Sequence, residues 1–253
     1  MKVIAIANQK GGIGKTTTAT CMASILNARE HKTLLIDADV QRNSTDTYRA
    51  EYEGVPTLYD VILEDDKPLS LKDAIQETEM GEIVAADPLL AEGESKLSSK
   101  GIKGYMTLRN ALKDLDGYEY VIIDTPPAVN MILRNILTAA DEIVIPITPD
   151  RYGFQGMSDF SETINDIKAL NPDLKVAGIL LVKYDKKTVL GRESQDALED
   201  LSKQLDTKLF DTKIRECIKT REAQAVRSTL IKYAKGCTTE RDYEDFVEEY
   251  LGI

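Results

Sequence analysis

The sequence is poor in the residues that metal sites and nucleophilic triads most often use. It has one histidine, His31, and three cysteines that lie far apart, Cys21, Cys217 and Cys237. A single histidine excludes histidine-based triads and histidine-rich metal sites, and the absence of a CxxC pair disfavours zinc sites and disulfide frameworks. We expect His31 to be an ordinary surface residue in a turn. Free cysteines fit a reducing cytoplasm.

The sequence also lacks long apolar runs and an excess of positive charge. No apolar stretch approaches the roughly 20 residues that span a bilayer, and residues 1–7 lead into a glycine-rich loop rather than forming a signal region. The formal net charge is −11, which argues against a surface covered with basic patches but allows a local one. We therefore expect a cytoplasmic protein with no membrane partner.

The clearest motif is the segment of residues 8–20, NQKGGIGKTTTAT, which follows an apolar run and begins a helical pattern. A strand, a glycine-rich turn and a helix N-terminus together direct backbone N–H groups at one point and favour an anion there. The general pattern G-x-x-x-x-G-K-[ST] would place its first glycine at Gln9, and a lysine, Lys10, precedes the glycine pair instead. The segment predicts a nucleotide-phosphate site formed by Gly11, Gly12, Ile13, Gly14, Lys15, Thr16 and Thr17. Lys15 would reach the terminal phosphates, and the Thr16 hydroxyl would hold Mg²⁺.

Carboxylates follow two of the short apolar runs. KTLLID ends at Asp37 and is followed by Asp39, and EYVIID ends at Asp124. Such runs are typical of buried parallel strands, and ligands bind at the carboxyl edge of an open α/β sheet. Asp37 and Asp39 could simply cap a loop. Beside a phosphate loop, they become candidates for supporting Mg²⁺ and positioning water, and Asp124 for reaching Mg²⁺ through water.

The order of the expected elements indicates the fold class. Apolar strands alternate with helical patterns, which predicts an α/β fold with a mostly parallel central sheet and helices on both faces. The absence of repeats and low-complexity linkers favours one continuous P-loop NTPase domain over residues 1–253. In detail, we expect helices over 71–77 and 89–97, a polar loop over 43–54, and a last short strand over 209–210.

The string KGGIGKTTT resembles the deviant Walker A motif of the ParA/MinD ATPases. The resemblance extends nearly end to end, through LLIDADVQRNST, DTPP, AADEIVIPIT and NPDLKVAGILLVKYD. It implies an ATP-sandwich homodimer in which Lys10 crosses to the nucleotide of the other subunit, so Lys10 joins the catalytic and nucleotide-binding residues. It also implies that Asp39 polarises the attacking water and Asp37 supports the metal shell. Val40 replaces the proline that usually follows Asp39 in this family.

The same resemblance suggests where the base and DNA bind. Where many relatives have I-P-R-N near the adenine, this chain has Ile214, Arg215, Glu216 and Cys217, so Arg215 and Cys217 are expected at the adenine. Residues 208–235 carry eight cations against three acids, either a solvated face or a surface for DNA phosphates. Family positions suggest Lys186, Lys187 and Lys219 as DNA contacts.

ParA proteins partition DNA, bind DNA nonspecifically as ATP dimers, and are stimulated by a ParB-like centromere-binding protein. The resemblance therefore implies a Mg²⁺-dependent ATPase that is nucleoid-associated, and we expect no N-terminal helix-turn-helix extension. A MinD-like membrane role requires a basic amphipathic C-terminal helix, whereas ERDYEDFVEEYL is acidic. An electron-transfer enzyme resembling the nitrogenase iron protein requires paired cluster cysteines, which this sequence lacks. A relative that positions protein cargo stays open as an alternative.

Overall fold

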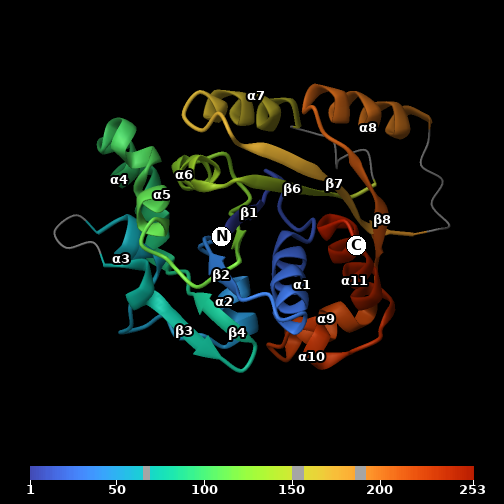
Figure 1. Cartoon of the computed structure of the whole chain (residues 1–253), viewed down its shortest axis with the longest axis horizontal. Helices are drawn as coiled ribbons and strands as arrows, with labels where there is room; N and C mark the ends of the chain where they lie inside the picture. The colour runs from blue at the N-terminus through green and yellow to red at the C-terminus, as the bar shows by residue number, and fades with distance from the viewer. Residues whose placement is uncertain (65–68, 150–156, 186–191) are drawn as a thin grey trace.

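The computed structural model describes residues 1–64, 69–149, 157–185 and 192–253. They form one α/β domain around an eight-stranded sheet, shown in Figure 1. The strands are β1 (Lys2–Ile6), β2 (Thr33–Asp37), β3 (Ile75–Thr78), β4 (Gly81–Val84), β5 (Tyr120–Asp124), β6 (Glu142–Ile147), β7 (Lys175–Tyr184) and β8 (Leu209–Arg215). Their order in the sheet is β3-β4-β2-β5-β1-β6-β7-β8. All neighbours pair in parallel except β3 and β4, so the predicted, mostly parallel sheet is confirmed.

The helices cover both faces of this sheet. They are α1 (Lys15–Ala28), α2 (Asn43–Tyr48), α3 (Leu58–Ile62), α4 (Gly93–Ser99), α5 (Thr107–Leu112), α6 (Met131–Ala139), α7 (Met157–Lys168), α8 (Arg192–Gln204), α9 (Ile218–Ala225), α10 (Leu230–Tyr233) and α11 (Thr238–Leu251). Short 3₁₀ helices span Leu71–Ala74, Pro88–Glu92 and Gly101–Tyr105. In Figure 1, α6, α7 and α8 lie on one face, and α1, α9, α10 and α11 on the other.

The strand residues alternate between two separate hydrophobic cores. In β1, Val3 and Ala5 pack in the core beneath α3–α8, whereas Ile4 and Ile6 pack in the core beneath α1 and α11. Because both faces are covered, each central strand is apolar throughout, which is the pattern of a fully buried parallel strand. The same burial leaves the strand ends as the places where polar side chains can meet a ligand.

The helix predicted at the sheet edge is wrong in its second half. The helix expected over 71–77 stops at Ala74, and Ile75–Thr78 form β3. This strand pairs antiparallel with β4 through a tight return at Gly81, whose φ of 124° suits glycine. Pairing with a strand already in the sheet overrides the local helical pattern.

Other boundaries also differ from the prediction. The segment expected to be a loop over 43–54 begins with helix α2, which is held at its N-terminal end by a buried carboxylate described below. The helix expected over 89–97 divides into a 3₁₀ helix and α4. The last strand, β8, continues to Arg215 rather than ending at Phe210, and this extension forms one wall of the candidate site.

Candidate functional site

The loop between β1 and α1 has the conformation of an anion cradle. Gly12 and Gly14 adopt φ values of 71° and 96°, and Gly14 directly precedes the first residue of α1. A Cβ added at Gly14 would lie 3.9 Å from the Val182 side chain, and one added at Gly12 would meet open space, so neither position is restricted by crowding. Glycine is therefore required by the backbone, since a side chain in the left-handed region costs about 1–2 kcal/mol.

Two buried side chains that the sequence analysis did not single out fix this loop to the sheet. The Asn8 amide donates to the Pro146 carbonyl at the end of β6 (2.9 Å), and its Oδ1 accepts from the Lys10 N–H (3.0 Å). The Thr125 hydroxyl, after β5, donates to the Ile6 carbonyl (2.8 Å). Neighbouring strands thus determine where the loop begins. Asn8 begins the motif quoted above, but the motif does not reveal its bond to Pro146, which is 138 residues away.

Lys15 lies buried at the bottom of the loop. Its Nζ donates to the Lys10 carbonyl (2.9 Å), and only 6% of the residue is exposed. Burial lowers the pKa of Lys15, and the carboxylates of Asp124 and Asp39 partly oppose this effect. A desolvated ammonium with one neutral acceptor is well placed to exchange that acceptor for a phosphate oxygen. Lys10 itself is half-buried and lies beside the cavity rather than in its lining.

The three predicted carboxylates meet at the carboxyl edge of the sheet. Asp37 and Asp124 are register partners on neighbouring strands, and Asp39 follows two residues after Asp37. The Asp39 N–H donates to Asp37 Oδ1 (3.1 Å), while Asp39 Oδ1 accepts from the Gln41 N–H (3.0 Å). Of these three residues, Asp39 lines the cavity directly.

Asp37 and Asp124 differ in how their oxygens are used. Asp37 Oδ2 accepts from both the N–H and the hydroxyl of Thr45 (2.8 Å each), which anchors α2. Asp124 Oδ2 accepts from the Ser44 hydroxyl (2.8 Å), but its buried Oδ1 has no hydrogen-bond partner among the described residues. An orphaned carboxylate oxygen costs free energy unless a cation or a bound water meets it.

Burial raises the pKa of both carboxyls above the ordinary range. For Asp37, proximity to Asp124 adds to the effect, and hydrogen bonds from Thr45 oppose it. For Asp124, the Ser44 and Thr16 hydroxyls oppose it, and the Asp39 carboxylate reinforces it. Two adjacent buried carboxylates disfavour ionisation of both, and a divalent cation would remove that penalty.

The described residues contain no cluster of three or more histidine, cysteine, aspartate or glutamate side chains able to enclose a metal ion. Mg²⁺ is usually held by one or two protein groups together with phosphates and water, rather than by a cage of side chains. Thr16, at the first turn of α1, lines the cavity, and its hydroxyl opposes the rise in the pKa of Asp124. Thr16 and Asp124 could therefore share such an ion.

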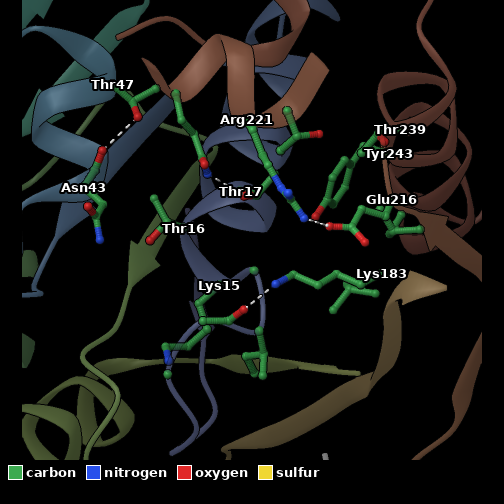
Figure 2. A pocket seen from close by; sticks show the side chains of 18 of the residues that line it. Lys15, Thr16, Thr17, Asn43, Thr47, Lys183, Glu216, Arg221, Thr239 and Tyr243 are labelled. Atoms are coloured by element: carbon green, nitrogen blue, oxygen red, sulfur yellow. Dashed lines mark hydrogen bonds and ion pairs between the residues drawn. The ribbon is translucent and has the colours of Figure 1, made fainter. Parts of the chain in front are cut away.

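A cavity of about 470 Å³ lies over the glycine loop, and Figure 2 shows its lining. Its floor is formed by residues 11–17, and one wall comes from β7 and α9. Lys183, at the end of β7, donates from Nζ to the Gly12 carbonyl (2.6 Å). Gln224 of α9 donates to the Thr17 hydroxyl (3.3 Å). The sequence analysis missed Lys183 and Gln224, because both contacts depend on tertiary structure.

The predicted base-binding residues, Arg215 and Cys217, both line the cavity. The Arg215 guanidinium, however, is engaged by the Asp242 carboxylate of α11, with Nε 2.9 Å from Oδ2 and Nη2 2.5 Å from Oδ1. Its N–H also donates to Asp242 Oδ2 (2.8 Å), and its carbonyl accepts from the Thr239 hydroxyl (2.7 Å). The Arg215 side chain, N–H and carbonyl therefore hold β8 against α11. A base in the cavity would instead contact Cys217 and the backbone of the neighbouring residues.

Of the three lysines predicted to contact DNA, the structure describes Lys219. Lys219 is exposed on α9, where its Nζ lies 2.8 Å from Glu222 Oε2. Lys186 and Lys187 lie outside the described residues. Several other cations of residues 208–235 also have acidic partners: Arg215 with Asp242, Arg221 with Glu216, and Lys232 with Glu79. The excess charge of this stretch is therefore partly neutralised locally. No described helix is long and apolar enough to cross a bilayer.

Comparisons with known proteins bear on the family of this chain. A family model described as an AAA domain matches residues 1–176. The chromosome partitioning protein ParA of Myxococcus xanthus is 33% identical over 93% of this chain and 84% of its own. The structure of apo McdA from Cyanothece superposes with a TM-score of 0.86 at 26% identity, covering both chains completely. Cobyrinic acid a,c-diamide synthase from Mycobacterium smegmatis, with bound ADP and magnesium, gives a TM-score of 0.82 at 28% identity over 99% and 94% of the chains. The chain belongs to the ParA family of P-loop ATPases.

Proposed function

We propose that this protein is a DNA-partition ATPase that uses ATP and Mg²⁺ to switch a homodimer on and off DNA. The observation that carries the proposal is the convergence of Lys15, Thr16 and Asp39 on one cavity, beside a second loop lysine, Lys10. The similarity to a chromosome partitioning protein over nearly the whole chain supports the biological role. The domain assignment, 1–253, rests on the same similarity.

ATP would bind with its phosphates over residues 11–17 and its base between β8 and α11. Lys15, now bonded to a backbone carbonyl, would turn to the terminal phosphates. Thr16 and the unpartnered oxygen of Asp124 would hold Mg²⁺ beside the phosphates, and Asp37 would support them. When bound, the ion supplies charge neutralisation for phosphoryl transfer.

Asp39 is proposed to orient the attacking water. Its backbone N–H donates to Asp37 Oδ1, and its carboxylate Oδ1 accepts from the Gln41 N–H. A fixed acceptor at the cavity wall can align water without adding ground-state affinity for ATP. Lys10 is proposed to act across the dimer on the partner's nucleotide, as the family resemblance implies.

The Asp39→Ala variant tests the catalytic assignment. We expect ATP binding and dimerisation to persist while hydrolysis falls by about 10²-fold or more, since water alignment is lost. Lys10→Ala should instead retain ATP binding and lose ATP-dependent dimerisation, as measured by sedimentation with a slowly hydrolysed analogue. Asp114→Ala, an exposed acidic residue that lies outside the lining of the nucleotide cavity, is a control for general damage. Parental turnover in Asp39→Ala would place catalysis elsewhere.

DNA binding and the ParB-like partner are the finer parts of the proposal. Lys219 with Lys186 and Lys187 would contact DNA phosphates, and closing the dimer would double those contacts, raising avidity by about 10²–10⁴. DNA retention should therefore require ATP and fall steeply with salt. A DNA-carpet wash at two salt concentrations, with Lys219→Ala and a Lys186/Lys187 double alanine, tests this surface. Addition of a ParB-like protein tests stimulation.

A second candidate is positioning of protein cargo, which the resemblance to this family leaves open. Both candidates share the ATP-dependent dimer, so the assays on Lys10 and Asp39 do not separate them. Stimulation of hydrolysis does. A centromere-binding ParB-like protein that accelerates turnover supports partition of DNA, whereas an unchanged rate with that protein contradicts it.

A further inference from the structure

A second polar cavity, of about 530 Å³, lies behind the nucleotide site between α2 and the end of α9. We call it the arginine pocket. Its lining is Arg42, Asp46, Arg49, Ala50, Tyr52, Val226 and Arg227. Helix α2 separates the two cavities, since its Asn43 and Thr47 line the nucleotide site instead. The proposed ATPase mechanism uses none of the three arginines.

The backbone at these arginines is unusual. Arg42, Arg49 and Arg227 have φ values of 56°, 56° and 51°, in the left-handed region. In the part of the chain that the structure describes, six non-glycine residues have positive φ, and these arginines are three of them. Glycine would adopt this conformation without strain, whereas any larger side chain pays for it. Three strained residues of one type in one pocket indicate that the side chains are kept for a ligand.

The guanidinium groups of Arg42 and Arg49 are held in different ways. The Arg42 guanidinium stacks on the Tyr52 ring, 3.9 Å from its centroid, and its buried Nε has no acceptor within the described residues. Arg49 donates through Nε and Nη2 to the carbonyls of Arg227 (3.0 Å) and Val226 (3.2 Å). These bonds join α2 to the end of α9. A stacked guanidinium keeps its in-plane N–H edge free for a planar pair of oxygens.

The charge balance of the pocket favours an anion. Three arginines face one carboxylate, Asp46, in the lining. Outside the lining, Lys232 and, more weakly, Arg49 lower the pKa of Glu79, which is ion-paired with Lys232 at 2.8 Å. A concave site with several guanidinium groups matches the geometry of a phosphate, which accepts bidentate bonds.

We propose that the arginine pocket binds a phosphate group, as a second anion site of this protein. The phosphate could belong to the DNA backbone or to a free phosphorylated molecule, and the recognition chemistry is the same. This proposal goes beyond the ATPase function, because it requires neither hydrolysis nor Lys219. Binding there would also tighten the junction of α2 and α9, whose other faces line the nucleotide cavity.

The first experiment titrates pyrophosphate into the full-length protein by calorimetry. Saturating ADP keeps the nucleotide site filled, so that heat reports a different site. We expect Arg227→Gly to weaken pyrophosphate binding by about tenfold or more, the loss of one good charge-assisted contact. The melting temperature should not fall, since glycine relieves the left-handed strain. Asp206→Gly is the matched control: Asp206 has φ 49° and is outside the pocket lining, so this variant relieves the same strain.

The second arm measures retention of a short duplex DNA with a slowly hydrolysed ATP analogue. Weaker duplex binding in Arg227→Gly and Arg42→Gly assigns the site to backbone phosphates, and loss confined to pyrophosphate assigns it to free phosphates. Arg227→Gln, which keeps the side-chain length and removes the charge, covers the case in which glycine alters the loop. If neither probe distinguishes these variants from Asp206→Gly, the proposal is overturned. Basal ATP hydrolysis in Arg227→Gly should equal the parental rate, so failure here leaves the ATPase proposal intact.

Discussion

Asp242 offers a direct test of how the far wall of the nucleotide cavity is built. Its side chain is 6% exposed, and its carboxylate accepts from the Arg215 N–H (2.8 Å) and from the Arg215 guanidinium. The carboxylate thus joins α11 to the end of β8. In Asp242→Ala, the wall loses this connection, and the backbone N–H loses its acceptor.

The loss of stability depends on whether water can replace Asp242 as the partner of each Arg215 group. The Arg215 side chain is 37% exposed, so water can replace much of its lost pairing, and that part counts for little. The N–H bond to a buried carboxylate is charge-assisted and contributes about 1.5–3 kcal/mol. We expect a loss of about 2–3 kcal/mol in the free energy of unfolding. At about 2.1 cal/mol/K of unfolding entropy per residue, a chain of 253 residues should melt about 4–6 °C lower.

The assay is thermal unfolding with and without ATP, beside a control at Asp245. Asp245 is exposed on the same helix and adds a long-range attraction to Arg215, so Asp245→Ala should change stability by about 0.5 kcal/mol or less. The ATP affinity of Asp242→Ala should fall as well, because Arg215 and Cys217 line the cavity. An unchanged melting temperature with reduced ATP affinity would refute a structural role for Asp242. It would indicate that the Arg215 guanidinium contacts the nucleotide instead.

Two further predictions concern positions that the sequence did not highlight. In Gly178→Ala, the new Cβ would lie 2.5 Å from the ring of Phe210, which is buried against Phe246. We expect overpacking to lower the free energy of unfolding by about 1–3 kcal/mol. Urea unfolding measures this change, and an unchanged midpoint would contradict this packing. In Lys183→Met, the bond to the Gly12 carbonyl is lost; we expect nucleotide affinity to fall about fivefold, the effect of about 1 kcal/mol at an exposed site, with kcat nearly unchanged. A fall in kcat alone would instead indicate a role in hydrolysis.

The sequence predicted the parts of the site that depend on local chemistry. Residues 11–17 form the cradle because the glycines, the lysine and the hydroxyl must be adjacent for the loop to work. The predicted strands also lie in the sheet, since continuous apolar runs can be buried on both faces. Local patterns are sufficient where one segment performs the whole task.

The contacts that were missed join segments far apart in the chain. Asn8 bonds to Pro146, Lys183 to Gly12, and Gln224 to Thr17. Each residue type is common on protein surfaces, and its partner is set by the strand order rather than by spacing. The same reason explains β3, whose pairing with β4 decides its structure. The positive charge of residues 208–235 was likewise visible in the sequence, but its partial neutralisation by Glu79 and Asp242 was not.

The register of the central strands explains why the two strand-end aspartates have different environments. Parallel pairing places Asp37 directly beside Asp124, so two buried carboxylates share one edge. Thr45 and the Asp39 N–H satisfy Asp37 with three donors, and those bonds hold α2 and the Asp39 backbone in place. Asp124 keeps one buried oxygen without a partner in the described structure. A cation in the cavity would relieve Asp124 first, since Asp37 is already satisfied. These contacts support the proposal that Asp124 would be the carboxylate for Mg²⁺, while Asp37 holds the backbone that carries Asp39.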